Sequence, residues 1–207
     1  MSHSIETLTE EEQTKFVLSF YRELPTPTQR LIQTRDRLLM LLMLDAGLRV
    51  GEAVSLTIGD LHILDAPVGM IYIRAEISKT KSERSVPVTS RLSDAIQEMW
   101  LNVWHKDARH PPCYAFISVT WTDHISARQV QRMIQTAGIC SISRPVHPHM
   151  LRHTFATRIM KKCSIRVVQT LLGHKALSST QIYTHVNSQD LQSAINALNA
   201  GPRQGET

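Results

Sequence analysis

The stretch LLMLLML (Leu38 to Leu44), followed by DAGLRVGE (Asp45 to Glu52), decides how this chain folds. Seven consecutive apolar residues leave a helix without a polar face, so we expect the second half of a helix over about 28–46 to lie at the centre of the core. Gly47 is expected to end this helix as its C′ residue, because glycine readily adopts the left-handed conformation found there. A shorter helix follows around 50–56 and carries Glu52.

Helical patterns surround one extended stretch. Thr9 followed by Glu12 forms a capping box and predicts a helix over about 10–23. Val68–Ile73 and Arg84–Val88 have the composition of strands, and the polar turn between them predicts a hairpin. Further helices are predicted over about 90–103 (capped by Thr89 or Ser90), 126–137 (ended by Gly138), 148–162, 165–172 (capped by Ser164, ended by Gly173), and from Ser178 or Ser179 through Tyr183. The predicted fold class is mainly α with a small antiparallel β-hairpin, an α+β fold.

The 207 residues are expected to form one domain over 1–200, because this length supports a single substantial core. A last amphipathic piece carries Leu191, Ile195 and Leu198. Residues 200–207 form a polar tail.

Charge is distributed unevenly along the chain. The net charge is +5, but residues 1–30 hold three basic and five acidic residues. Between Asp123 and Asp190 there is no carboxylate, while this window holds nine Lys and Arg residues and six histidines. A solvated basic face is one interpretation of such a window. Sixty-six residues without an acid favour a polyanionic partner instead, above all nucleic acid.

Other features restrict the class of protein. The longest apolar run, Leu38 to Leu44, is much shorter than the roughly 20 residues that span a bilayer. The N-terminus lacks the basic-then-apolar pattern of an export signal. Cys113, Cys140 and Cys163 form no CxxC pair, which suits reduced thiols in a cytoplasm, buried as small apolar residues.

Four short strings contain residues that can act on a phosphate: GLRVGE with Arg49, SKTK with Lys79, HMLRH with His149 and Arg152, and LGH with His174, followed nine residues later by Tyr183. Taken singly, each has a structural alternative. Arg49 could pair with Glu52, Lys81 competes with Lys79, and Tyr183 could be a half-buried structural tyrosine. His149 and His153 have zinc-ligand spacing and His147 lies nearby, but Met150 breaks the HExxH pattern.

Together, in order and spacing, these strings resemble the catalytic domain of the tyrosine recombinases, the phage-integrase family. That family carries an Arg in a G-L-R-x-x-E string, a Lys in a β-hairpin turn, an H-x-L-R-H string, an L-G-H string and a downstream Tyr. The resemblance covers roughly residues 7–199. It implies a catalytic set of Arg49, Lys79, His149, Arg152, His174 and Tyr183, with Glu52 bracing the first arginine and His153 in a supporting role.

The chemistry of a phosphodiester explains this set. Two guanidiniums can grip the non-bridging oxygens through planar forks, and two histidines can add hydrogen bonds and move protons near neutral pH. By resemblance, Lys79 protonates the departing 5′-oxygen while Tyr183 holds the DNA as a 3′-phosphotyrosyl ester. The ester conserves bond energy, so rejoining needs neither ATP nor metal, and we expect no cofactor and no metal site.

The resemblance also implies the partners. We expect double-stranded DNA, a homo-oligomer (a tetramer) on DNA, no membrane and no small-molecule substrate, in a bacterial cytoplasm and on the nucleoid when DNA is bound. An N-terminal DNA-clamp domain is expected to be absent, and the sequence is then either a fragment or a naturally short member of the family. Residues 188–199 are a possible C-terminal helix exchanged with a neighbouring protomer, although their apolar stripe could equally pack within the same chain. The predicted function is site-specific DNA recombination, by integration, excision, inversion or resolution. The alternatives are a nicking-closing enzyme of the type IB topoisomerase kind and a catalytically idle DNA-binding regulator.

Overall fold

The computed structural model describes residues 6–79, 81–105, 113–118 and 124–173, together with residues 192, 195 and 196. Seven α-helices occur in these ranges: α1 (Glu10–Leu18), α2 (Pro27–Leu44), α3 (Val50–Val54), α4 (Ser90–Met99), α5 (Ala127–Ile142), α6 (Pro148–Met160) and α7 (Ile165–Leu172). Two antiparallel hairpins pair β1 (His62–Ile63) with β2 (Ala66–Pro67) and β3 (Met70–Ile73) with β4 (Arg84–Pro87). The prediction of a mainly helical fold with a small antiparallel sheet is confirmed.

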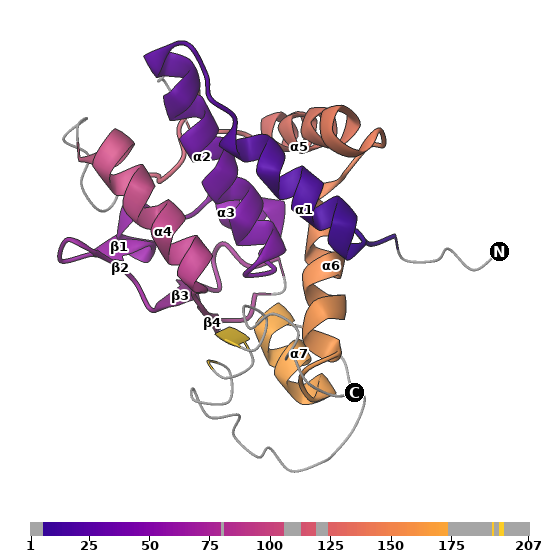
Figure 1. Ribbon diagram of the computed structural model, residues 1–207. Coiled ribbons are helices and arrows are strands. Elements are labelled where there is room, and N and C mark those ends of the chain that lie inside the picture. The colour runs from indigo at the N-terminus through magenta and orange to yellow at the C-terminus, as the bar shows by residue number, and fades with distance from the viewer. Residues whose placement is uncertain are drawn as a thin grey trace.

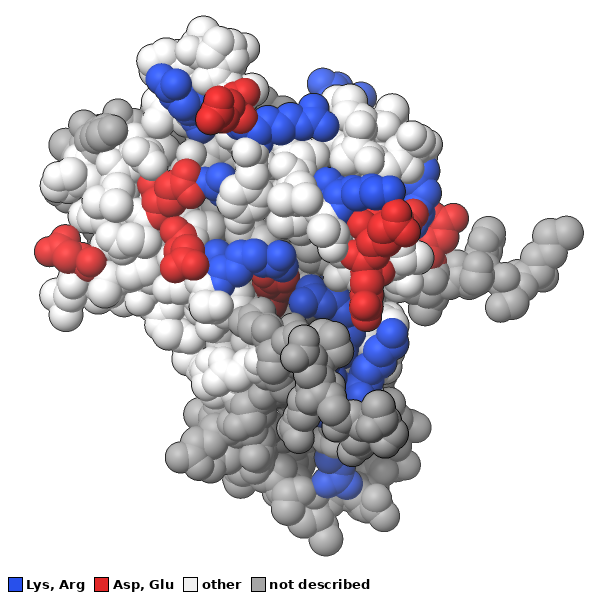
Figure 2. Space-filling model, viewed as in Figure 1, with Lys and Arg blue, Asp and Glu red and all other residues white. Residues whose placement is uncertain are grey.

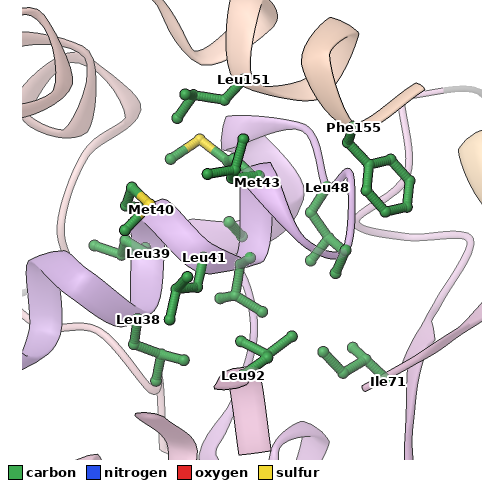
Figure 3. Close-up of a cluster of buried hydrophobic side chains, with 14 of the residues drawn as sticks. Leu38, Leu39, Met40, Leu41, Met43, Leu48, Ile71, Leu92, Leu151 and Phe155 are labelled. Atoms are coloured by element: carbon green, nitrogen blue, oxygen red, sulfur yellow. The ribbon is translucent and has the colours of Figure 1, made fainter. Parts of the chain in front are cut away.

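Helix α2 is the centre of the molecule (Figure 1). It packs against α4 and α6, while α1 packs against α5. Every residue from Leu38 to Leu44 is completely buried, as the all-apolar run predicts. Figure 3 shows these side chains packed with Ile71 of β3, Leu92 of α4 and Leu151 of α6. Burial of this run therefore fixes the hairpin and α6 around one core.

The boundaries of most elements follow local signals. Thr9 and Ser126 cap α1 and α5 through complete capping boxes, and Thr89 caps α4. Helix α1 is shorter than predicted and continues as a 3₁₀ turn, η1 (Ser19–Tyr21). The helix predicted over 90–103 is divided into α4 and a π-helical turn, η3 (Trp100–Trp104). The short pair β1–β2 and the 3₁₀ turn η2 (Ile58–Asp60) were not predicted.

The prediction that Gly138 ends a helix is wrong. Helix α5 continues through Ile142 and ends at Ser143, which has a left-handed φ of 58°. Gly138 is buried within the helix, where a Cβ atom would lie 2.8 Å from the Arg144 carbonyl oxygen and 2.8 Å from the Val146 nitrogen. This glycine therefore allows the chain after α5 to cross the helix closely.

Two of the three cysteines also differ from expectation. Cys113 and Cys140 are exposed, and Cys163 is half-buried; all three are free thiols. Val130, Ile134 and Gly138 form the buried face of α5 at a spacing of four residues. Cys140 lies two residues, or roughly 200°, beyond Gly138, so it faces outward.

The C-terminal predictions fall mostly outside the described residues. The helix expected from Ser178 or Ser179, the polar tail and most of 188–199 are not described, although Ile195 is completely buried. Within the described part of the chain, no helix is long and apolar enough to cross a membrane.

Candidate active site

Arg49 is the N-cap residue of α3 and lies five residues after the end of α2. Helix α2 ends at Leu44 with Asp45 as its C-cap, and Gly47 follows with a left-handed φ of +63°. Gly47 is thus two residues beyond the cap rather than the C′ residue that was predicted. The backbone N–H of Arg49 donates to Oε2 of Glu52 at 2.8 Å, and its Nη1 donates to Oε1 at 3.0 Å. Glu52 therefore braces Arg49, as expected.

Glu52 has a second partner that sequence reasoning missed, Arg84 at the start of β4. Nη1 and Nη2 of Arg84 donate to the two oxygens of Glu52 at 2.9 and 2.6 Å. The burial of Glu52 raises its pKa, but the hydrogen bonds and positive charges of Arg84 and Arg49 outweigh this and lower it overall. One signal was present in the sequence. Arg84 is two residues before the buried Val86, so both side chains are on the core face of the strand, where an arginine requires an acidic partner.

Arg152 projects from α6 toward two backbone carbonyl groups. Its Nη1 donates to the Gly47 oxygen, and its Nη2 donates to the Leu172 oxygen at 2.6 Å. The residue is only 6% exposed. Burial, followed by the positive charges of Arg49 and Arg84, lowers the pKa of Arg152 to about 9. Arg152 is still cationic at neutral pH.

These groups border an open cleft of about 460 Å³. Its lining combines residues from α3, the turn between β3 and β4, and the start of α6, among them Arg49, Glu52, Ser78, Lys79, Lys81, His149 and Arg152. Lys79 is exposed in the turn, and His149 is exposed on the first turn of α6. The structure thus brings four of the six predicted site residues to one cleft.

Lys81 lines the same cleft, with a left-handed φ of 51°. Lining alone therefore does not distinguish the two lysines of the turn. His153 lies one helical turn after His149, with 6.5 Å between the ring centroids. Partial desolvation, followed by the positive charges of His149 and Arg152, lowers the pKa of His153. His153 is not among the lining residues of the cleft.

His174 and Tyr183 lie outside the described residues. The structure does describe the point from which this segment starts. Helix α7 ends at Leu172, and Gly173 follows with a left-handed φ of +63°, so the prediction that Gly173 ends the helix is confirmed. Leu172, whose carbonyl oxygen accepts from Arg152, is two residues before His174.

The arrangement is suited to binding an anion. The lining of the cleft holds four cationic side chains and two carboxylates, which leaves an excess of two positive charges: Arg49, Lys79, Lys81 and Arg152 against Glu52 and Glu76. On the face viewed in Figure 2, acidic and basic side chains are interspersed. Elsewhere than in the cleft, arginines pair with acids, as in Arg91–Asp45 and Arg144–Glu12. Among the described residues, no group of three or more His, Cys, Asp or Glu side chains could hold a metal ion. Such a cationic cleft can hold and polarise a phosphate group.

Comparison with known proteins identifies similar chains. The model of the phage integrase family matches residues 8–190. A tyrosine recombinase of Pseudothermotoga lettingae is 36% identical over 182 residues, which cover 84% of this chain and 59% of the relative. Tyrosine recombinase XerC of Haemophilus influenzae is 40% identical over 162 residues, covering 77% of this chain and 52% of the relative. The chain thus spans little more than half the length of these curated relatives.

Solved structures show the same fold. The XerA recombinase superposes with a TM-score of 0.67 at 26% identity, over 95% of this chain and 66% of that chain. XerH recombinase in a post-cleavage complex with palindromic difH substrate has a TM-score of 0.65 at 25% identity, over 95% of this chain and 54% of that chain.

Proposed function

Because the chain belongs to the phage integrase family, we propose that it cleaves and rejoins DNA through a 3′-phosphotyrosyl intermediate and so recombines specific DNA sites. One observation carries the proposal. Arg49, Lys79, His149 and Arg152, which are far apart in sequence, line one cleft with an excess of positive charge. Fixed cations stabilise the charge that develops on a phosphodiester under attack, and the proton-transfer groups can protonate the leaving oxygen.

Arg49 and Arg152 bind the scissile phosphate in this proposal. Each guanidinium carries five N–H donors, and the contacts to Glu52, Gly47 and Leu172 use only some of them. The remaining donors can reach the non-bridging oxygens, on which charge accumulates in the transition state. Because these contacts hold the arginines before the substrate arrives, they need little reorganisation during the reaction. His149 adds a hydrogen bond to the same phosphate.

In the bond exchange at phosphorus, Tyr183 is the nucleophile and Lys79 is the proton donor. The Tyr183 oxygen attacks and forms the P–O bond, while the bond from phosphorus to the 5′-oxygen breaks. Lys79 gives a proton to that leaving oxygen, and the phenolic proton passes to a histidine of the site. His174 completes the phosphate contacts. Reversal of these steps with another 5′-hydroxyl joins the new strands.

The partner in this reaction is double-stranded DNA. XerH recombinase, which has the same fold, has been solved in a complex with difH substrate. We propose that this chain assembles as a homotetramer on DNA, since an exchange between two duplexes uses four strands. We also propose that it acts in the bacterial cytoplasm, and on the nucleoid when DNA is bound.

A nicked suicide DNA that carries the protein's own flanking sites tests the proposal. The wild type is expected to form a covalent protein–DNA adduct, and Tyr183→Phe is expected to form none. Tyr21→Phe is the matched control, because Tyr21 is 46% exposed on η1 and does not line the cleft. Absence of an adduct in the wild type, or an adduct in Tyr183→Phe, would refute the proposal. An adduct without exchange between two sites would indicate a nicking-closing enzyme.

A modified DNA separates the roles of the two lysines. Sulfur in place of the 5′-bridging oxygen makes a leaving group that needs no proton. Lys79→Ala should therefore cleave ordinary DNA poorly and the sulfur-containing DNA well, whereas Arg152→Ala should cleave both poorly. Lys81→Ala should behave as the wild type on both. If the sulfur-containing DNA restores cleavage by Lys81→Ala rather than by Lys79→Ala, the assignment of Lys79 is wrong.

A further inference from the structure

Arg84 links two parts of the site that the sequence separates widely. We propose that it is a positioning residue, which holds Arg49 through Glu52 and also holds the end of α7, from which the segment with His174 and Tyr183 begins. The inference rests on the proposed function and assigns a role to a residue outside the predicted catalytic set. Its side chain is only 2% exposed, so it acts through its neighbours rather than by touching DNA.

The first of the two groups that Arg84 connects is the carboxylate of Glu52. Its two oxygens accept four hydrogen bonds in all, two from Arg49 and two from Arg84. The Arg84 fork is bidentate, with distances of 2.9 and 2.6 Å, which fixes both the position and the plane of the carboxylate. Because the same carboxylate orients Arg49, a displacement of Arg84 would be transmitted to Arg49.

The second group that Arg84 connects is the C-terminus of α7. The last carbonyl groups of a helix have no partner within the helix, and positive charge is favourable beside them. Nε of Arg84 donates to the Leu171 oxygen at 2.9 Å, and Nη2 of Arg152 donates to the Leu172 oxygen at 2.6 Å. Two arginines therefore anchor the final turn of α7. One of them is a predicted catalytic residue, and the other is Arg84.

Gly173 makes this anchoring possible. At its φ of +63°, a Cβ atom would lie 3.1 Å from Cδ of Arg84 and 3.3 Å from its Nη1. The guanidinium thus packs closely against the backbone that leads into His174. A lysine at position 84 would keep the charge but could not bridge Glu52 and Leu171 with one planar group.

The experiment compares Arg84→Gln and Arg84→Lys with Arg74→Gln. Arg74 is a matched control, because it directly follows Ile73, the partner of Arg84 in the hairpin, yet pairs with Asp60 at 2.5 Å and does not line the cleft. Two quantities are measured: the single-turnover rate of suicide-DNA cleavage at saturating DNA, with the DNA dissociation constant, and amide hydrogen exchange in peptides covering α7 and α5.

For Arg84→Gln we expect cleavage to slow about 100-fold, as for an active-site group misplaced by about 1 Å, while DNA affinity changes less than about threefold. Exchange at the end of α7 should rise roughly tenfold or more, because an anchoring charge-assisted bond is lost. Exchange in α5 should stay unchanged. Arg84→Lys should recover part of the cleavage rate, and Arg74→Gln should match the wild type in every measurement.

The inference is overturned if Arg84→Gln cleaves as fast as Arg74→Gln, or if exchange in α7 does not change. If Arg84→Gln fails to fold, Arg84→Lys provides the test. A cleavage rate and an amide exchange in α7 that both equal those of the wild type would then refute the inference. A wild type that forms no adduct refutes the proposed function separately. In that case the exchange measurement, which needs no DNA, supports the link if exchange in α7 rises and overturns it if exchange is unchanged.

Discussion

Replacement of Gly47 by alanine should destabilise the protein far more than a single methyl group suggests. Gly47 has a φ of +63°, a conformation that costs an L-residue about 1–2 kcal/mol. The added Cβ would also overlap the ring of the buried Phe155. Overpacking of this kind costs about 1–3 kcal/mol. The two effects together predict a loss of about 2–5 kcal/mol, a large part of the roughly 5–15 kcal/mol that stabilises a typical domain.

Urea unfolding of four variants, Gly47→Ala, Gly51→Ala, Phe155→Ala and the double variant of Gly47 and Phe155, checks this magnitude. Gly51→Ala is the control, because Gly51 lies within α3 and a Cβ atom there would meet nothing within 4 Å. It should leave the free energy of unfolding unchanged or raise it by up to about 1 kcal/mol. In Phe155→Ala, where the ring is absent, adding Gly47→Ala should cost only the backbone part, about 1–2 kcal/mol. Equal effects of Gly47→Ala and Gly51→Ala, or an equal cost of Gly47→Ala with and without the ring, would refute the reasoning.

Three further predictions concern acid stability, packing and anion binding. The hydrogen bond from Arg144, and after it the hydrogen bond from the Thr9 backbone, lowers the pKa of Glu12 from 4.5 to about 2. The ionised Glu12 therefore contributes its full stabilisation of the folded protein above pH 4.5, and this contribution is lost as the pH falls toward 2. With allowance for solvent exposure this amounts to about 1 kcal/mol, and urea midpoints of the wild type should fall more steeply over that window than those of Glu12→Gln. Gly138→Ala should cost about 1–3 kcal/mol in urea unfolding, because its Cβ would collide with Val146 and the backbone beside it. Sulfate at ten times its dissociation constant should raise the Tm of the wild type by about 3–6 °C in a thermal-shift assay, with little effect on Arg152→Gln.

Much of the fold could be predicted because its signals are local. The capping boxes at Thr9 and Ser126, and the apolar run from Leu38 to Leu44, each determine an element without help from distant residues. The β1–β2 turn could not be predicted in this way. Its two turn residues, Leu64 and Asp65, both have positive φ, where Asn-Gly is the usual signal.

Gly138 shows a second limit of local reasoning. A glycine after a run of helical residues usually marks a C-terminus, and here the same residue is required by a contact with Arg144 and Val146. The contact depends on how the chain returns across α5, which no local pattern encodes. The helix therefore extends past the predicted stop.

The candidate site also contains residues that the sequence predicts and a residue that it does not. The order and spacing of the motifs predicted Arg49, Lys79, His149 and Arg152, and the fold brings all four to one cleft. Arg84 was missed because its role depends on tertiary contacts with Glu52 and Leu171, which are distant in sequence. For His174 and Tyr183 the assignment remains a prediction from the motif.

The charge balance of the cleft links stability to function. Burial and the charges of Arg49 and Arg84 lower the pKa of Arg152 to about 9, which means that the folded protein holds this cation at a cost in free energy. The carbonyl oxygens of Gly47 and Leu172 offset part of that cost, and Glu52 offsets part of the repulsion. A bound phosphate would supply the missing negative charge. Since an anion binds the folded cleft and not the unfolded chain, a bound DNA phosphate should offset the cost of burying Arg152 and so raise the free energy of unfolding.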